Sequence, residues 1–238
     1  MNVAVIIAGG SGTRTNQDIP KQFLNVLDKP IVVYTMEAFQ KHPEIDAIEV
    51  VCLDGWHDVL KAYARQFGIA KLKWVVSGGQ TGQESIRNGV SNLKDKISDD
   101  DIVIIHDGIR PMVSEDVISD CIEKCREHGN GITSLPITEQ IFSVENEIYT
   151  EKFIPRETLR IQQTPQAYKF EKIYAGYEKA FSENIGISSS SYANTMMAEL
   201  GEKLYFAKGS SKNIKITTKE DIEIFKAMLL SKKDDWLK

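Results

Sequence analysis

The chain has 238 residues, of which 42% are hydrophobic and 26% are charged, and its formal net charge at pH 7 is -5. A chain of this length can bury a substantial core, so we expect a single α/β domain over residues 1–238. The acidic balance argues against a nucleic-acid-binding protein, and no apolar run approaches the roughly 20 residues of a membrane-spanning helix. The N-terminus lacks the flanks of a signal peptide, so we expect a cytoplasmic protein.

Residues 3–7 form the first apolar run and predict a buried strand that leads into a glycine-rich loop. The loop reads Ala8-Gly9-Gly10-Ser11-Gly12-Thr13-Arg14, and Lys21 follows a short way on. Its uncovered backbone N–H groups can bind an anion, and Arg14 and Lys21 add two positive charges near the same place. We therefore predict that residues 10–13 bind phosphate groups, with these two cations beside them.

Two common phosphate-binding patterns do not fit this loop. When the dinucleotide-binding pattern G-x-G-x-x-G starts at Gly10, Thr15 stands where the third glycine belongs. The P-loop pattern needs Gly-Lys-Ser/Thr, which occurs nowhere in the chain. The missing third glycine disfavours a dehydrogenase on a dinucleotide-binding fold. Such a dehydrogenase remains an alternative from a different class of enzymes.

Strand and helix patterns alternate along the next part of the chain. A helix with the apolar face Ile31, Tyr34, Thr35, Ala38 and Phe39 precedes predicted strands at 47–53, 72–76, 102–105 and 131–135 and predicted helices at 57–66, 85–93 and 115–128. This alternation predicts a mostly parallel, twisted sheet with helices on both faces, an α/β fold of the Rossmann-like, three-layer α/β/α type. Ligands of such sheets bind at the carboxyl ends of the strands.

Polar motifs follow the third and fourth predicted strands. Residues 77–85 read Ser-Gly-Gly-Gln-Thr-Gly-Gln-Glu-Ser, and their short side chains and open backbone suit the edge of a base. Asp107 ends the next strand in the motif His106-Asp107-Gly108-Ile109-Arg110-Pro111. A carboxylate that faces a phosphate loop suits a hard divalent cation, so we predict that Asp107 binds Mg²⁺ or Mn²⁺. We expect this ion to lie beside a second substrate that carries a phosphate group of its own, which we call the acceptor. The planar fork of Arg110 suits the phosphate group of this acceptor.

The pattern changes in the last third of the chain. Residues 139–155 read as a hairpin with a polar tip and strands at 141–144 and 148–150, a ribbon with too few neighbours to be stable alone. In the later motif Gln163-Thr164-Pro165-Gln166, the hydroxyl of Thr164 precedes a rigid proline. We assign Thr164 to the acceptor, because this hydroxyl is a well-placed hydrogen-bond donor.

The chain ends in another strand and helix. Residues 212–218 predict a strand that runs into a closing helix at 219–230. On such a strand, Ile214 and Ile216 point to one face and Lys215 points to the other. The ammonium group of Lys215 can then reach the phosphate site.

Three motifs together, AGGSGTRTNQDIPKQF, H-D-x-x-R-P and QQTPQ, resemble those of the cytidylyltransferases, which activate sugar or polyol phosphates with CTP. The resemblance spans almost the whole chain and implies a nucleotidyltransferase fold of the glycosyltransferase-A-like type. It implies that Lys215 contacts the nucleotide phosphates. It also implies that residues 139–156 form a β-arm that embraces a second copy of the chain and brings Arg156 to the partner's active site. The implied contacts with the cytosine base are Ala8, Gly9, Gly79, Gln80 and Ser85.

The chain departs from the family pattern at a few positions. Gly82 stands where an arginine is usual, and Glu139-Gln140 replaces an Asp-Thr pair. Ser191-Tyr192-Ala193 lies where the members that use 2-C-methyl-D-erythritol 4-phosphate have Thr-Asp-Glu-Ala. The acidic residue that often precedes the last strand is missing, which leaves Asp107 as the expected protein ligand of the metal.

Basic groups and one carboxylate at a phosphate site suit nucleotidyl transfer, in which positioning and charge neutralisation do most of the catalysis. We expect an acceptor held by Arg110, Arg156 and Thr164 to attack the α-phosphorus of CTP and expel pyrophosphate, with Arg14, Lys21 and Lys215 as the catalytic residues. The stretches PKQFLNVLDKPIVVYT, QQTPQ and FAKGSSKNIKITT favour D-ribitol 5-phosphate as the acceptor, for teichoic acid or capsule precursors. 2-C-methyl-D-erythritol 4-phosphate, for isoprenoids, and another sugar phosphate remain open, as does a catalytically silent nucleotide-binding protein.

Overall fold

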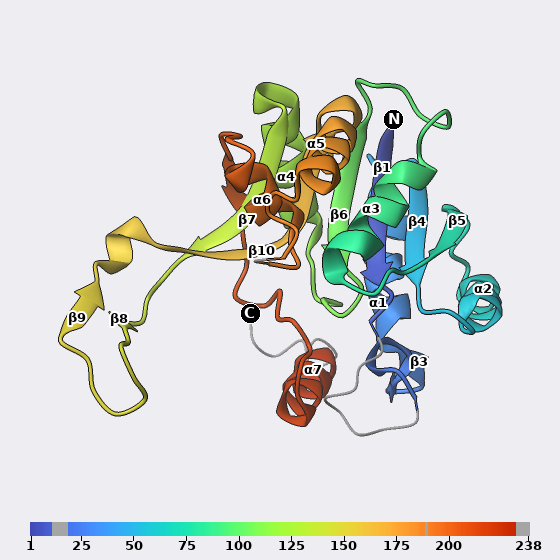
Figure 1. The fold of residues 1–238 in the computed structure, drawn as a ribbon. Coiled ribbons are helices and arrows are strands. Elements are labelled where there is room, and N and C mark those ends of the chain that lie inside the picture. The colour runs from blue at the N-terminus through green and yellow to red at the C-terminus, as the bar shows by residue number, and fades with distance from the viewer. Residues whose placement is uncertain (11–18, 189, 232–238) are drawn as a thin grey trace.

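The computed structural model describes residues 1–10, 19–188 and 190–231 of the chain (Figure 1). Its central sheet has seven strands in the order β11-β7-β10-β6-β1-β4-β5. Neighbouring strands run parallel except at β10, which is antiparallel to both β6 and β7. The mostly parallel sheet that the sequence predicts is therefore confirmed. The strands of this sheet are β1 (Asn2–Ala8), β4 (Ala47–Cys52), β5 (Leu72–Ser77), β6 (Ile102–Asp107), β7 (Asn130–Pro136), β10 (Arg160–Lys169) and β11 (Phe206–Lys208).

Each face of the sheet carries its own hydrophobic core, because successive side chains of a strand point to opposite faces. Ala4 and Ile6 of β1 belong to one core, and Val3 and Val5 belong to the other. The helices that cover the first face are α1 (Ile31–Lys41), α2 (His57–Gln66) and α4 (Glu115–His128), and those that cover the second are α3 (Gly82–Asn92), α5 (Phe170–Glu183) and α6 (Ala193–Glu199). The three-layer α/β/α fold is thus confirmed.

The strand β10 lies in the middle of the sheet, between β6 and β7. No strand is predicted there from the sequence, because a proline among polar residues is unusual in a central strand. The structure accommodates Pro165 at an irregularity, where the pairing of β10 with β7 shifts in register between Gln162 and Gln166. This irregularity brings Thr164 against the end of β6, where its Oγ1 accepts a hydrogen bond of 3.1 Å from the backbone N–H of Asp107.

Residues 139–156, the arm, project away from the sheet (Figure 1). The arm contains a two-stranded antiparallel sheet of β8 (Ile141–Ser143) and β9 (Lys152–Ile154). The strand predicted at 148–150 is wrong, because the side chain of Asn146 accepts hydrogen bonds from the backbone N–H groups of Ile148 and Tyr149 and so forms a turn there. The short 3-10 helix η3 (Arg156–Thr158) joins the arm to β10.

The strand predicted at 212–218 is also wrong, because these residues pair with no strand of the sheet. They follow an irregular path that is held by a hydrogen bond of 2.9 Å from the N–H of Ile216 to the carbonyl oxygen of Ile109. Ile216 is nevertheless buried against Phe225 of α7 (Lys219–Ser231), while Lys215 lines a cavity on the other side. The predicted direction of Lys215 therefore holds without a strand.

Three short elements lie between β1 and α1 in the described part of the chain. The 3-10 helix η2 (Lys21–Phe23) precedes the small hairpin of β2 (Asn25–Val26) and β3 (Lys29–Pro30). Within the described ranges, no helix combines the length and the apolar character needed to cross a membrane.

Candidate active site

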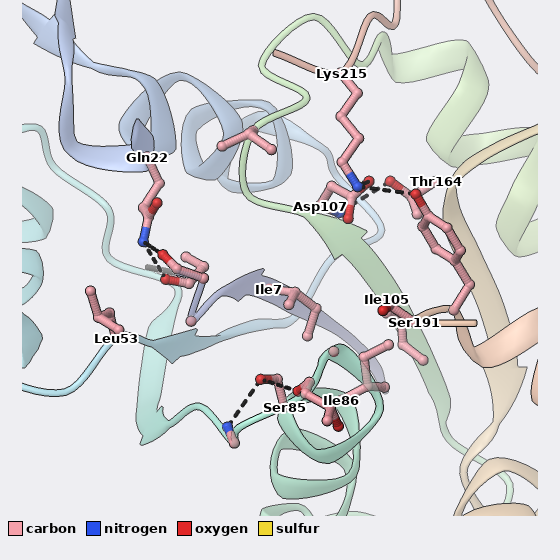
Figure 2. Close-up of a pocket in the computed structure, with 18 of the residues that line it drawn as sticks. Ile7, Gln22, Leu53, Ser85, Ile86, Ile105, Asp107, Thr164, Ser191 and Lys215 are labelled. Atoms are coloured by element: carbon pink, nitrogen blue, oxygen red, sulfur yellow. Dashed lines mark hydrogen bonds and ion pairs between the residues drawn. The ribbon is translucent and has the colours of Figure 1, made fainter. Parts of the chain in front are cut away.

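A cavity of about 840 Å³ lies at the carboxyl ends of β1, β5 and β6 (Figure 2). This is the edge of the sheet at which the sequence predicts the site. Most of the predicted site residues line it, although they come from segments far apart in the chain. These are Ala8, Gly9, Gly10, Lys21, Gly79, Gln80, Ser85, Asp107, Thr164 and Lys215.

Some predicted site residues are not placed at this cavity. Ser11, Gly12, Thr13 and Arg14 lie outside the described residues, so their predicted contacts with phosphate stay predictions. Arg110 and Arg156 are described, but neither lines the cavity.

The glycine-rich loop after β1 is held by Gln22. Its Nε2 donates hydrogen bonds of 2.8 Å to the carbonyl oxygen of Ala8 and 2.9 Å to that of Gly10 (Figure 2). Gln22 is buried, so these bonds are shielded from water. The sequence analysis assigns no role to this residue, although it directly follows Lys21 in the PKQF stretch. The position of the start of the glycine-rich loop therefore depends on a residue of η2.

Lys21 lines the cavity and is almost fully buried. Its Nζ donates a hydrogen bond of 3.1 Å to the carbonyl oxygen of Thr217, just before α7. The lysine therefore connects the first motif of the chain with the last one. Both predicted lysines of the site, Lys21 and Lys215, reach the same cavity from these two segments.

The loops after β1 and β5 approach each other through glycines. A Cβ atom at Gly9 would lie 3.1 Å from the Cα of Gly78, so a side chain there would push the loops apart. Ser85 shapes the second loop, because its Oγ accepts a hydrogen bond of 3.0 Å from the N–H of Gly79 and donates one of 2.9 Å to the carbonyl oxygen of Thr81 (Figure 2). The predicted base-binding residues are thus adjacent in space.

Asp107 lies at the centre of the charged part of the site. Its Oδ2 accepts a hydrogen bond of 3.0 Å from Nε of Arg110. The same Oδ2 lies 3.2 Å from Nζ of Lys215 (Figure 2). Burial raises the pKa of Asp107, but the charges of Lys215 and Arg110 outweigh burial and hold this pKa below its usual range. Asp107 is therefore an anion near neutral pH.

Lys215 makes a second contact, with a residue that has no role in the sequence analysis. Its Nζ donates a hydrogen bond of 3.1 Å to the hydroxyl of Tyr192 and lies 5.0 Å from the centre of the Tyr192 ring. Burial lowers the pKa of Lys215, but the interactions with Asp107 and Tyr192 outweigh burial and raise this pKa. Lys215 therefore stays an ammonium group that is available to phosphate oxygens.

Arg110 is buried behind Asp107 instead of lining the cavity. Besides its bond to Asp107, it donates a hydrogen bond of 2.8 Å from Nη1 to the carbonyl oxygen of Asn213. Asn213 in turn donates from Nδ2 to the carbonyl oxygen of Thr164 at 2.7 Å. Arg110 therefore orients the Asp107 carboxylate and links it to the Lys215 segment, and the predicted contact of Arg110 with an acceptor phosphate stays a prediction.

The arrangement suits anionic substrates. The cavity combines two lysines and the ionised Asp107 with loops of open backbone, and such groups can bind a nucleotide and neutralise its phosphates. Among residues 1–10, 19–188 and 190–231, no three His, Cys, Asp or Glu side chains gather in a way that could hold a metal ion. Among the described residues that line the cavity, Asp107 carries the carboxylate that a metal ion bound there would meet.

Comparisons with known proteins agree with this chemistry. The sequence pattern of the family described as "IspD: 2-C-methyl-D-erythritol 4-phosphate cytidylyltransferase" matches residues 2–231. A ribitol-5-phosphate cytidylyltransferase of Lacticaseibacillus paracasei is 55% identical over 98% of this chain and 99% of its own length. One of Vibrio parahaemolyticus, with the same name, is 38% identical over 96% of each chain.

A solved structure supports the fold. The crystal structure of the 4-diphosphocytidyl-2C-methyl-D-erythritol synthase from Anaerococcus prevotii matches 96% of this chain and 96% of its own, with a TM-score of 0.82 and 26% identity. The match of the family pattern covers more than nine tenths of the chain. The chain therefore belongs to the IspD family of cytidylyltransferases, which are CTP-dependent nucleotidyltransferases.

Proposed function

We propose that this protein transfers the cytidylyl group of CTP to D-ribitol 5-phosphate and so makes CDP-ribitol and pyrophosphate. The observation that carries the proposal is the convergence of Lys21, Lys215 and the ionised Asp107 on one cavity, beside the loops expected to bind the base. The choice of acceptor is supported by the 55% identical relative, which is named a ribitol-5-phosphate cytidylyltransferase.

In the proposed reaction, the loops after β1 and β5 hold the cytosine and the glycine-rich loop holds the triphosphate. An oxygen of the acceptor phosphate attacks the α-phosphorus of CTP in line, a new P–O bond forms, and the bond to the β-phosphate oxygen breaks. Pyrophosphate leaves with the electron pair of that bond. Lys21, Lys215 and Arg14 stabilise the negative charge that spreads over the phosphate oxygens in the transition state.

Asp107 is the proposed protein ligand of a Mg²⁺ or Mn²⁺ ion. The fit rests on two points: Asp107 lines the cavity, and the charges of Lys215 and Arg110 hold its pKa below the usual range, which favours the carboxylate form. When bound, the ion would neutralise charge on phosphate oxygens. Arg110 keeps the carboxylate in position for this purpose.

The acceptor site is completed by Thr164 and by Arg156 of a second subunit. Arg156 lies on the exposed arm and donates a hydrogen bond of 3.1 Å to the carbonyl oxygen of Thr138. A two-stranded ribbon without a core of its own is marginal in water, and large apolar side chains of the arm are exposed. These side chains are Phe142, Val144, Ile148, Tyr149 and Phe153. Association of two copies through residues 139–156, in a cytoplasmic homodimer, would cover them.

The test is an acceptor panel. Purified protein receives CTP and Mg²⁺ with D-ribitol 5-phosphate, 2-C-methyl-D-erythritol 4-phosphate or another sugar phosphate, and pyrophosphate release and the CDP-linked product are measured. The expected result is the highest kcat/KM with D-ribitol 5-phosphate, which would place the enzyme in teichoic acid or capsule synthesis. A preference for 2-C-methyl-D-erythritol 4-phosphate, the substrate in the family's name, would replace the proposal with the isoprenoid reaction.

A further inference from the structure

One wall of the cavity is made of consecutive hydroxyl-bearing residues. Ser190, Ser191 and Tyr192 line it just before α6. None of them is among the site residues expected from the sequence. Ser191 and Tyr192 belong to the stretch in which this chain departs from Thr-Asp-Glu-Ala. The wall lies in the same cavity as Thr164 and Lys215, on which the proposed function relies.

The wall is held in place by Gln83 of α3, which is buried. Its Nε2 lies within hydrogen-bond distance of the carbonyl oxygens of Gly186, Ser190 and Tyr192, at 3.2, 2.9 and 2.9 Å. Its Oε1 accepts a hydrogen bond of 2.9 Å from the hydroxyl of Tyr177. The backbone of the wall is therefore fixed by a buried amide.

Gly82 allows the wall to approach α3 closely. A Cβ atom at Gly82 would lie 2.6 Å from the Cβ of Ser191 and 3.1 Å from its carbonyl oxygen. Any larger residue, including the arginine usual in the family, would move the wall. The observed position of the wall therefore depends on the absence of a side chain at Gly82.

The side chain of Tyr192 is oriented by Lys215. Because the ammonium group donates in the bond of 3.1 Å, the phenol oxygen acts as the acceptor, and its own O–H proton remains available for another partner. The ammonium also lies 5.0 Å from the ring centre, which favours the same orientation. Tyr192 therefore presents a donor that is held near the charged pair of Lys215 and Asp107.

We propose that Tyr192 determines acceptor specificity by donating its O–H to a hydroxyl of the polyol chain. This inference rests on the proposed function, because it requires a hydroxyl-rich acceptor phosphate in the cavity. The phosphate group is common to all candidate acceptors and cannot distinguish them. A fixed hydroxyl can distinguish them. Tyr192 is half-buried, and a bound acceptor that lacks the matching group would cover its donor and leave it unpaired.

The test is Tyr192→Phe, which keeps the ring over the ammonium and removes only the hydroxyl. The substrates are D-ribitol 5-phosphate and the shorter D-erythritol 4-phosphate, each at saturating CTP. We expect KM for D-ribitol 5-phosphate to rise about tenfold, as for the loss of one hydrogen bond, with KM for CTP unchanged. The preference for the five-carbon acceptor, measured as the ratio of the two kcat/KM values, falls by the same factor. Tyr63→Phe, on α2 outside the cavity, is the matched control and changes neither value.

The outcomes separate the two proposals. An unchanged preference in a folded Tyr192→Phe variant overturns the role of Tyr192 and leaves the proposed function standing. An equal loss with both acceptors, with a raised KM for CTP, also overturns it, because Tyr192 would then act only through Lys215 on the nucleotide. If the unmodified protein makes no CDP-linked product from either acceptor, the proposed function fails and this inference fails with it.

Discussion

Nζ of Lys215 lies 3.2 Å from Oδ2 of Asp107, although the two residues are far apart in the sequence. Each charge favours the ionised form of the other, so the pKa of Asp107 is lowered and that of Lys215 is raised despite their burial. The pair supplies the site with one anion and one cation at fixed positions. The anion suits a metal ion, and the cation suits a phosphate group.

Asp107→Asn tests the anion of this pair. The amide is similar in size, but it carries no charge for a divalent cation and no longer balances Lys215 and Arg110. We expect turnover to fall on the order of a hundredfold or more, by analogy with the loss of other groups that stabilise a transition state. The measurement is the rate of pyrophosphate release at increasing Mg²⁺. Asp58→Asn, an exposed residue of α2, serves as the control, and equal rates for both variants would contradict a role for Asp107.

Lys21→Ala tests the cation delivered by the first motif. The lysine lines the cavity, so its removal should lower kcat on the order of a hundredfold or more if it stabilises charge in the transition state. The lost hydrogen bond to Thr217 also affects the segment before α7, so a thermal melt must show that the variant is folded. Lys61→Ala, on the exposed side of α2, is the comparison. A folded Lys21→Ala variant with near full turnover would rule out the mechanism.

Much of the fold and the site follows from local sequence patterns. The alternation of apolar strands and amphipathic helices predicts both faces of the sheet, and the glycine loops and Asp107 follow strands at the edge where ligands bind. Lys215 also reaches the cavity as expected, even though its segment is irregular. These features could be predicted because they depend on the period of apolar residues and on the ends of strands.

Other features depend on contacts between distant segments, which no local pattern records. Gln22, Gln83 and Tyr192 are ordinary polar residues in the sequence, and their roles arise only when loops from different parts of the chain meet. Arg110 has the chemistry of a phosphate ligand, yet the fold turns it toward Asp107 and Asn213. The central strand β10 is obscured by Pro165, which a bulge accommodates.

Glu49→Gln is expected to change how stability depends on pH. Glu49 is fully buried on β4, and burial raises its pKa to about 7, although a hydrogen bond of 2.5 Å from Asn92 and the charge of Lys96 oppose this shift. The unfolded chain ionises this group near its ordinary pKa of 4.5. Its contribution to stability is therefore complete below pH 4.5 and is lost as the pH rises through about 7, with a cost of about 3 kcal/mol.

The neutral glutamine removes this loss. Urea unfolding at pH 5 and pH 8 should show that Glu49→Gln gains free energy of unfolding, relative to the unmodified protein, on going to the higher pH. Glu183→Gln, at the exposed end of α5, should show no such gain. A pH dependence that is the same for the unmodified protein and Glu49→Gln would mean that Glu49 ionises alike in the folded and unfolded chains.

If the protein forms the proposed homodimer, mixed dimers can show whether the arm acts on the partner's site. Arg156→Ala and Lys21→Ala are each expected to be nearly inactive alone. If Arg156 serves the neighbouring site, a mixed dimer of the two variants has one site with both residues intact. Random pairing of equal amounts in a two-fold dimer then restores about one quarter of full turnover. The measurement is the rate of pyrophosphate release by co-expressed subunits, with their association followed by sedimentation.

The matched control for this experiment is a mixture of Lys21→Ala and Lys215→Ala. Both of these residues line the cavity of their own chain, so each variant damages the site of its own subunit. Both sites of a mixed dimer of this pair are therefore damaged, and no turnover is recovered. Recovery in the first mixture and not in the second places Arg156 in the partner's site. Mixed dimers that form but recover no turnover would instead confine Arg156 to its own chain, where it bonds to Thr138 and lies outside the cavity.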